Sequence, residues 1–234
     1  MDERLGQFDH TGCAVLDGIV DAPTVAALRE ACEPLLMGER GPRPGVRRVL
    51  ERAPQVWEIV RASSIVDLAQ EVAGARAQVV RSILFDKTEQ TNWLVPWHQD
   101  ATIAVKERME VPGFGPWSVK DGEAHCRPPR NILDGVLVLR VHLDDVGADN
   151  GPLRVVPGSH AEGLLPAAEV DRVAGAMAYV ECCTKAGGVV LMRPHSVHAS
   201  PKATRPMRRR VLHLEWSADD LPGGLAWAEV AAGV

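Results

Sequence analysis

The sequence predicts a mainly-β fold that carries helices at its N-terminal end. After Gly74, short runs rich in Val, Leu and Ile follow one another, among them AQVVRSILF, GVLVLRVHL, GGVVLM and RRVLHLEW. Turn clusters such as VGADNGP and SPKATRP separate these runs, as expected for strands. Before Gly74, apolar residues recur at helical spacing instead. Many short strands after a helical N-terminal third predict an antiparallel sandwich or barrel with helices on one side.

The N-terminal elements can be predicted in order. The residues CAVL form a short strand, and Asp21 then caps a helix that runs through TVAALREACEPLL. Two more helices are expected across 54–62 and 64–73, the second capped by Ser63 or Ser64. The apolar positions of the first helix recur at helical spacing, namely Val25, Leu28, Cys32 and Leu35.

Composition limits the class of protein. At 234 residues the chain fits a single domain, 1–234, with helical support over about 1–75. A net charge of −5 and a pI near 5.9 argue against nucleic-acid or membrane-surface partners. We expect no transmembrane helix, because no apolar run reaches about 18 residues. The N-terminal MDERLGQFDH does not read as a signal peptide. Five cysteines without framework spacing predict reduced thiols in the cytoplasm.

The stretch from about 103 to 133 is long, Pro-rich and without a clear period. A segment of this kind inside a compact domain is usually functional or disordered. We therefore expect a lid over a pocket, and Trp117, within GFGPWS, as a residue of that lid that excludes water and contacts substrate.

One short motif, WHQD, raises the question of chemistry. His98 and Asp100 lie two apart, so on a strand their side chains point the same way from Cα atoms about 6.6 Å apart. They could hold a metal or form a buried polar pair. The spacing alone is weak evidence, because the chain contains a second copy in His142 and Asp144.

Residues further along the chain strengthen the first copy. Iron(II) in non-haem oxygenases favours two histidines and one carboxylate with open coordination positions. His198, in MRPHSVHAS, is the candidate third ligand, with His195 as its competitor. Arg209 follows on the next predicted strand and could hold an anionic cosubstrate beside the metal. Its neighbours Arg208 and Arg210 should point away from it.

Several ordered motifs together resemble one family. They are the Phe8/Gly12 region, LFDKTEQTNWLVPWHQD, HLDDVGADNGPLRVVPGSH, GGVVLMRPHSVHAS and the RRR segment before VLHLEW. Over most of its length the chain resembles the phytanoyl-CoA dioxygenase family of Fe(II)/2-oxoglutarate oxygenases. The resemblance implies a double-stranded β-helix, the cupin-like jelly roll, with N-terminal helices and a core over about 76–220.

The resemblance also implies roles for individual residues. His98, Asp100 and His198 match the iron ligands. Arg209 would bind the distal carboxylate of 2-oxoglutarate, with Ser200 helping by a hydrogen bond.

Other positions are less closely specified. Ile83 matches a wall position of the cosubstrate pocket. Arg140 stands where relatives often have Trp; it could hold a carboxylate of cosubstrate or substrate, or pair at the rim of the barrel. Together with Arg81 it suggests a small, carboxylate-bearing substrate. His195 could help to read the substrate or lie in an exposed loop.

Two further groups have structural interpretations. His142 and Asp144, the rival pair, match a strand end and turn in the family pattern, which favours a structural role. By strand alternation Trp93, Val95 and Trp97 lie opposite His98, so we expect them to pack behind the metal-binding strand.

The implied activity uses Fe(II), 2-oxoglutarate and O2, forms succinate and CO2, and hydroxylates an unactivated C–H bond. The substrate would be an amino-acid-like molecule or a secondary-metabolite intermediate. The intact Asp100 favours hydroxylation over halogenation, whereas desaturation, epoxidation and cyclisation stay open. A non-catalytic ligand-binding jelly roll is the alternative. The sequence predicts no oligomeric state.

Overall fold

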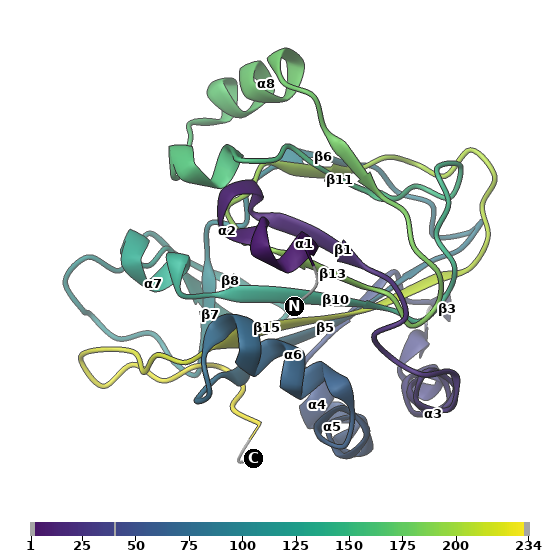
Figure 1. Cartoon of the computed structure of the whole chain (residues 1–234). Coiled ribbons are helices and arrows are strands. Elements are labelled where there is room, and N and C mark those ends of the chain that lie inside the picture. Colours follow the sequence, from purple (N-terminus) through teal and green to yellow (C-terminus); the bar gives the residue numbers. More distant parts are fainter. Residues whose placement is uncertain (1–2, 40, 232–234) are drawn as a thin grey trace.

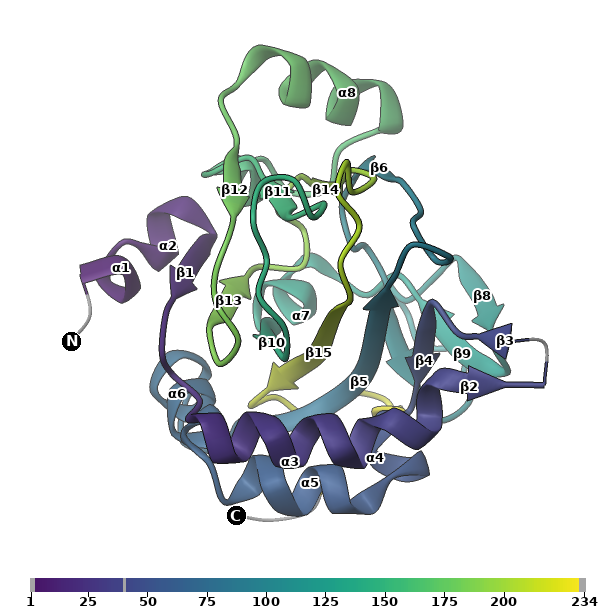
Figure 2. The ribbon, with the colours of Figure 1, turned by 90° about the vertical axis from the view of Figure 1, so that its right-hand side faces the viewer.

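Two antiparallel sheets face each other in a computed structural model that describes residues 3–39 and 41–231 (Figures 1 and 2). The six-stranded sheet has the order β1 (Cys13–Leu16), β13 (Val189–Met192), β10 (Leu137–His142), β15 (Arg209–Ser217), β5 (Gln78–Lys87) and β4 (Gly45–Arg47). The four-stranded sheet has the order β12 (Val180–Cys182), β11 (Leu153–Val155), β14 (His198–Ser200) and β6 (Val95–His98). This is the jelly roll that the sequence predicts.

The N-terminal helices are α1 (Glu3–Gly6), α2 (Phe8–Thr11), α3 (Ala22–Cys32), the 3-10 helix η1 (Glu33–Leu36), α4 (Val49–Arg52), α5 (Pro54–Arg61) and α6 (Ser64–Ala73). Among them, α3 to α6 cover the outer face of the six-stranded sheet, and α1 and α2 lie beside its edge strand β1 (Figure 2). The predicted caps are present, because Asp21 accepts a hydrogen bond from the Thr24 amide at 2.8 Å and Ser63 caps α6. Between these helices and the sheet lies the largest hydrophobic core, which includes Leu28, Val60, Leu139, Leu214 and Trp216.

Strand alternation divides β5, β10 and β15 between this core and the barrel interior. Leu84, Leu139 and Leu214 face the helices. The residues that alternate with these leucines face inward. Among them, His213 of β15 is the register partner of Ile83 on β5 and of Arg140 on β10. On these three strands the inner face carries polar side chains such as Arg81, Arg140 and His213, whereas the outer face is apolar.

The remaining helices lie outside the N-terminal group: α7 (Arg130–Asp134), the 3-10 helix η2 (Ser159–Glu162) and α8 (Ala167–Ala176). Helix α8 packs over the outer face of the four-stranded sheet through Val170 and Val173 (Figure 1). Within the described residues, no helix is both long and apolar enough to cross a bilayer.

The segment from 103 to 133 is more regular than its sequence suggests, and its role as a lid stays a prediction. It forms a third sheet, in which β9 (Glu123–Cys126) lies between β7 (Ile103–Val105) and β8 (Trp117–Lys120), and then α7. These strands have three or four residues each, and Gly and Pro interrupt the sequence between them, so their alternation is too short to be recognised. A two-stranded ribbon, β2 (Met37–Gly38) with β3 (Gly41–Pro42), completes the strands.

The expected limits of the domain stay predictions. They include residues 1–2, 40 and 232–234, which lie outside the described residues. The chain after β15 also packs on the core, since Trp227 pairs with Val105 and Glu229 accepts hydrogen bonds from Ser82.

Candidate metal centre and active site

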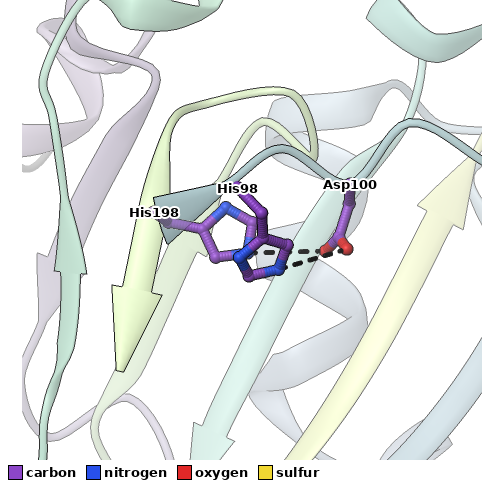
Figure 3. A group of neighbouring side chains, drawn as sticks. All are labelled: His98, Asp100 and His198. Atoms are coloured by element: carbon purple, nitrogen blue, oxygen red, sulfur yellow. Dashed lines mark ion pairs between the residues drawn. The ribbon is translucent and has the colours of Figure 1, made fainter. Parts of the chain in front are cut away.

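His98, Asp100 and His198 come together inside the jelly roll (Figure 3). His98 ends β6 and is the register partner of His198, the first residue of β14. One ligand atom from each of the three residues lies within 4.8 Å of the others. Asp100 Oδ1 is 3.8 Å from His98 Nε2, and Asp100 Oδ2 is 3.7 Å from His198 Nε2. Two imidazoles and one carboxylate in this arrangement fit the ligand set that iron(II) favours in non-haem oxygenases.

Backbone carbonyls set the tautomer of both imidazoles. His98 Nδ1 lies 2.9 Å from the carbonyl oxygen of Pro96, and His198 Nδ1 lies 2.8 Å from that of Ser196. A carbonyl oxygen only accepts, so each Nδ1 carries the proton and donates it. Each Nε2 then keeps its lone pair on the side of Asp100, as a metal ligand requires.

The charge state of the cluster agrees with metal binding. Burial lowers the pKa of His198 to about 4, so this imidazole is neutral at pH 7. Burial alone would raise the pKa of Asp100, but the neighbouring His198, His98, His213 and Arg81 outweigh that effect and lower it to about 2. The cluster therefore offers neutral imidazole and ionised carboxylate, the two forms that bind a divalent cation.

Gln99, between two of the ligands, holds their segment in place. Its Nε2 donates to the carbonyl oxygens of Gly163 and His195, both at 2.7 Å, and its Oε1 accepts from the Leu165 amide at 2.7 Å. The Asp100 amide donates to the carbonyl of Pro194 at 2.9 Å. Gln99 is not among the site residues predicted from the sequence. The available signal was its position between two candidate ligands, where its polar side chain would point away from them and need partners of its own.

A cavity of about 230 Å³ adjoins the cluster and meets a second cavity of about 500 Å³, with which it shares Arg47, Ile83, Phe85 and Trp93. The first cavity is called the inner cavity and the second the outer cavity. Besides the three cluster residues, the inner cavity is lined by Arg81, Ile83, Phe85, Trp93, Arg140, Ser200, Arg209 and His213, among others. The predicted residues of the cosubstrate pocket thus all lie around one space.

Arg209 is a buried cation without a carboxylate partner among the described residues. Its Nη2 donates to Ser200 Oγ at 3.4 Å, while Nε and Nη1 have no hydrogen-bond partner. Burial, with Arg140 nearby, lowers its pKa to about 9. A buried guanidinium with unused donors is costly unless an anion pairs with it. The arrangement therefore fits a bound carboxylate at Arg209.

Lys87 lies behind this position, on the strand that pairs with Arg209. Its Nζ donates to Ser200 Oγ at 2.9 Å and to the carbonyl of Pro201 at 2.8 Å. Burial and the cations Arg209 and Arg140 lower its pKa to about 7. Lys87 orients the Ser200 hydroxyl and adds positive charge to the same end of the cavity.

A buried polar chain crosses the inner face of the six-stranded sheet. Arg140 Nη1 donates to His213 Nδ1 at 3.0 Å, His213 Nε2 donates to Glu215 Oε1 at 3.3 Å, and Arg81 Nη1 donates to the same oxygen at 2.7 Å. Glu215 therefore neutralises Arg81. Arg140 contacts a neutral ring and stacks over Phe85 at 5.4 Å, so its charge stays available to a ligand.

Two residues expected at the substrate lie elsewhere. Trp117 packs with the small core beneath the third sheet, near Arg108, and lines neither cavity. His195 is buried, its Nε2 lies 3.1 Å from Asp134 Oδ1, and it lines neither cavity. The geometry gives the expected substrate role of Trp117 and His195 no support.

The prediction that Trp93, Val95 and Trp97 all pack behind the metal-binding strand is wrong in part. Trp93 and Val95 line the inner cavity, whereas Trp97 packs on the outside against Tyr179, with ring centroids 5.6 Å apart. The cause is a β-bulge: His98 pairs with His198, but Val95 pairs with Ser200. Between these two pairs β6 has one residue more than β14, and this extra residue turns the Val95 side chain to the cavity.

The rival histidine–aspartate pair is separated. His142 is buried, whereas Asp144 accepts hydrogen bonds from Arg210 at 2.8 and 2.9 Å. Arg208 pairs with Asp86, so both neighbours of Arg209 point away from the cavity as alternation predicts.

Fold and cluster together define a class: the non-haem iron oxygenases of jelly-roll fold. The sequence model of the phytanoyl-CoA dioxygenase (PhyH) family matches residues 8–211, and the chain belongs to this family. The resemblance seen in the motifs is thereby confirmed.

Individual relatives are more distant. L-proline trans-4-hydroxylase of Streptomyces griseoviridis is 25% identical over 185 residues, which are 68% of this chain and 61% of the hydroxylase. The chain thus matches less than two thirds of that enzyme's length.

Solved structures share the fold. The non-haem α-ketoglutarate-dependent carbocyclase SnoK from nogalamycin biosynthesis superposes with a TM-score of 0.73 at 20% identity, covering 100% of this chain and 94% of SnoK. EctD from S. alaskensis superposes with a TM-score of 0.71 at 20% identity, covering 93% of this chain and 76% of EctD.

Proposed function

We propose that this chain is an Fe(II)/2-oxoglutarate-dependent dioxygenase that hydroxylates an unactivated C–H bond of a small molecule and releases succinate and CO2. The observation that carries the proposal is the meeting of a two-histidine, one-carboxylate cluster and the unpaired guanidinium of Arg209 in one cavity. The cluster suits a metal, and the guanidinium suits the far end of a dicarboxylate cosubstrate.

In this proposal each residue has a defined task. His98 and His198 would hold the iron through Nε2 and Asp100 through a carboxylate oxygen. When bound, iron with 2-oxoglutarate and O2 supplies the oxidising chemistry. Arg209 and Ser200 would bind the distal carboxylate of 2-oxoglutarate, and Lys87 holds the Ser200 hydroxyl for that task.

The cavity wall would supply shape and shielding. Ile83, Phe85 and Trp93 line it on the side of the outer cavity and would exclude water from the reacting atoms. Arg140 would add positive charge facing either the cosubstrate or the substrate. The polar chain through His213 fixes the orientation of the Arg140 guanidinium.

The substrate would be an amino-acid-like molecule or a secondary-metabolite intermediate. The relatives support this range, since one hydroxylates L-proline and another comes from nogalamycin biosynthesis. We propose a single domain over residues 1–234. We also propose a cytoplasmic location, in keeping with five free cysteines, four of them buried.

A second outcome at the same centre is cyclisation, desaturation or epoxidation. The observation favouring it is the resemblance in fold to a carbocyclase. The intact carboxylate at Asp100 supports either outcome, and product analysis would separate them.

The test is a succinate assay. Purified protein is incubated with Fe(II), 2-oxoglutarate and O2, first without a substrate. We expect slow succinate formation that requires iron. Iron-loaded, folded protein that forms no succinate, with or without candidate substrates, would instead indicate a non-catalytic jelly roll.

A further inference from the structure

Two cations from separate elements line the inner cavity on the side where it adjoins the outer cavity, a side called the opening. Arg47 ends β4, the edge strand of the six-stranded sheet, and is the register partner of Ile83. Lys120 ends β8 of the third sheet. Both residues line the inner cavity, and Arg47 also lines the outer one. Figure 2 shows β4 and β8 on the same side of the barrel, beyond β5.

Neither cation has a strong partner among the described residues. Arg47 Nε lies 3.0 Å from Asp121 Oδ2, but the Asp121 side chain is 73% exposed. An ion pair with so exposed a carboxylate contributes little and exchanges readily with water or another anion. Lys120 has no ion-pair partner in the described part of the chain. Burial, followed by the positive charges of Arg81 and Arg47, lowers its pKa, as expected if these cations lie close together.

The carboxylates nearby are already committed. Asp100 belongs to the metal cluster, and Glu215 is held by Arg81 and His213. Glu123, the register partner of Lys120, is held by His125 at 2.9 Å and Arg48 at 3.6 Å. Arg47, Lys120 and Asp121 together therefore leave about one unit of positive charge at the opening, separate from that of Arg140, which lies on the central strand β10. In the proposed reaction the distal carboxylate of 2-oxoglutarate is bound by Arg209, so it does not use this charge.

We propose that Arg47 and Lys120 bind the carboxylate of the substrate, and that the substrate is a small monocarboxylic acid. The planar guanidinium of Arg47 matches a carboxylate in two parallel hydrogen bonds, and Lys120 adds a point charge. A net charge of one matches a carboxylate, whereas a phosphate monoester would bring an excess negative charge. The substrate's apolar body lies against Phe85 and Trp93, between the opening and the cluster.

The site rests on the proposed function, because it positions a substrate against that metal centre. It is tested by equilibrium binding without turnover. Protein loaded anaerobically with Fe(II) and 2-oxoglutarate is titrated with two pairs of probes, L-proline with L-prolinamide and benzoate with benzamide. Phenyl phosphate is the fifth probe. Ligand-observed NMR gives the dissociation constants.

We expect wild-type protein to bind at least one acid about tenfold or more tightly than its amide, the effect of one charge-assisted hydrogen bond. The double variant R47Q/K120Q should lose this preference. The control R172Q/K185Q removes two charges from exposed ion pairs elsewhere and should keep it. The single variant Lys120→Gln, at an exposed position, gives a partial loss even if the double variant folds poorly.

Three results would overturn the proposal: no acid preferred over its amide by the wild type, a preference that survives in R47Q/K120Q, or phenyl phosphate bound more tightly than benzoate. Succinate formation by the wild type is measured separately. Acid preference without succinate would refute the proposed function alone, and succinate without acid preference would refute this site alone.

Discussion

The imidazole rings of His98 and His198 face each other across β6 and β14, with centroids 4.1 Å apart. Two protonated rings at this separation would repel each other, and burial already keeps His198 neutral at pH 7. With both Nδ1 atoms bonded to carbonyls, the Nε2 atoms are directed to the space beside Asp100. The protein thus arranges the ligands through its own hydrogen bonds.

Removing the carboxylate should separate metal binding from folding. We expect Asp100→Ala to abolish iron-dependent succinate formation, because only two ligands remain. Asp144→Ala should instead lose about 1–3 kcal/mol of unfolding free energy, since Arg210 loses three hydrogen bonds and keeps only its pair with Glu33, and this variant should keep its iron. Metal content and thermal unfolding are measured on both variants. Normal turnover by the Asp100 variant would refute the ligand assignment.

Arg209→Ala should raise the KM for 2-oxoglutarate by about tenfold to a hundredfold, the loss expected for charge-assisted hydrogen bonds to a carboxylate. Arg208→Ala is the matched control, because its guanidinium pairs with Asp86 and Glu33 outside the cavity. Steady-state kinetics in 2-oxoglutarate give both values. An unchanged KM in the Arg209 variant would indicate that Arg140, and not Arg209, binds the distal carboxylate of 2-oxoglutarate.

Gln99→Leu keeps the size of the side chain but removes three hydrogen bonds that hold the ligand segment. We expect affinity for Fe(II) or Co(II) to fall about tenfold to a hundredfold, as for other residues that orient metal ligands. The Co(II) absorption spectrum should change as well, which a general loss of stability would not cause. An unaltered spectrum and affinity would show that Gln99 has no part in positioning the ligands.

Asp144 should make stability depend on pH. Burial would raise its pKa, but hydrogen bonds from the Arg210 side chain and amide outweigh burial and lower it below the ordinary value of 3.8. A carboxyl with a lower pKa in the folded state stabilises the fold above its unfolded pKa. This stability is lost as the pH falls through the folded value. The difference in unfolding free energy between wild type and Asp144→Asn should therefore be full at pH 7 and shrink below about pH 4. A difference that stays constant down to pH 2 would contradict this.

Much of the fold could be predicted because its signals are local. Asp21 and Ser63 cap their helices as expected, and the Val-, Leu- and Ile-rich runs form β5, β10, β13 and β15 of the six-stranded sheet. Only part of the third sheet could be predicted. Ile103 of β7 pairs with Cys126 of β9, and because these partners are distant in sequence no local pattern records the pairing. Strands β8 and β9 instead form a hairpin around Asp121 and Gly122, an Asp-Gly turn signal that is visible in the sequence.

The site shows the same division. The sequence order of His98, Asp100 and His198 identifies them as candidates, and inward alternation places Arg140 and Arg209 at the cavity. The orientation of Val95 depends on a register shift between β6 and β14, and the residue spacing within one strand cannot predict such a shift. Arg47 was not a candidate, since its role follows from the packing of β4 beside β5.

The metal ligands come from the four-stranded sheet and the segment after β6. Arg47 instead comes from the edge strand of the six-stranded sheet, and Lys120 comes from a hairpin of the third sheet. Edge strands and hairpin tips tolerate exchange of side chains better than central strands do. Natural selection can therefore alter chemical preference at these two places while the catalytic apparatus is inherited unchanged. For the same reason, a library randomised at positions 47 and 120 is a compact starting point for redirecting this scaffold to new compounds.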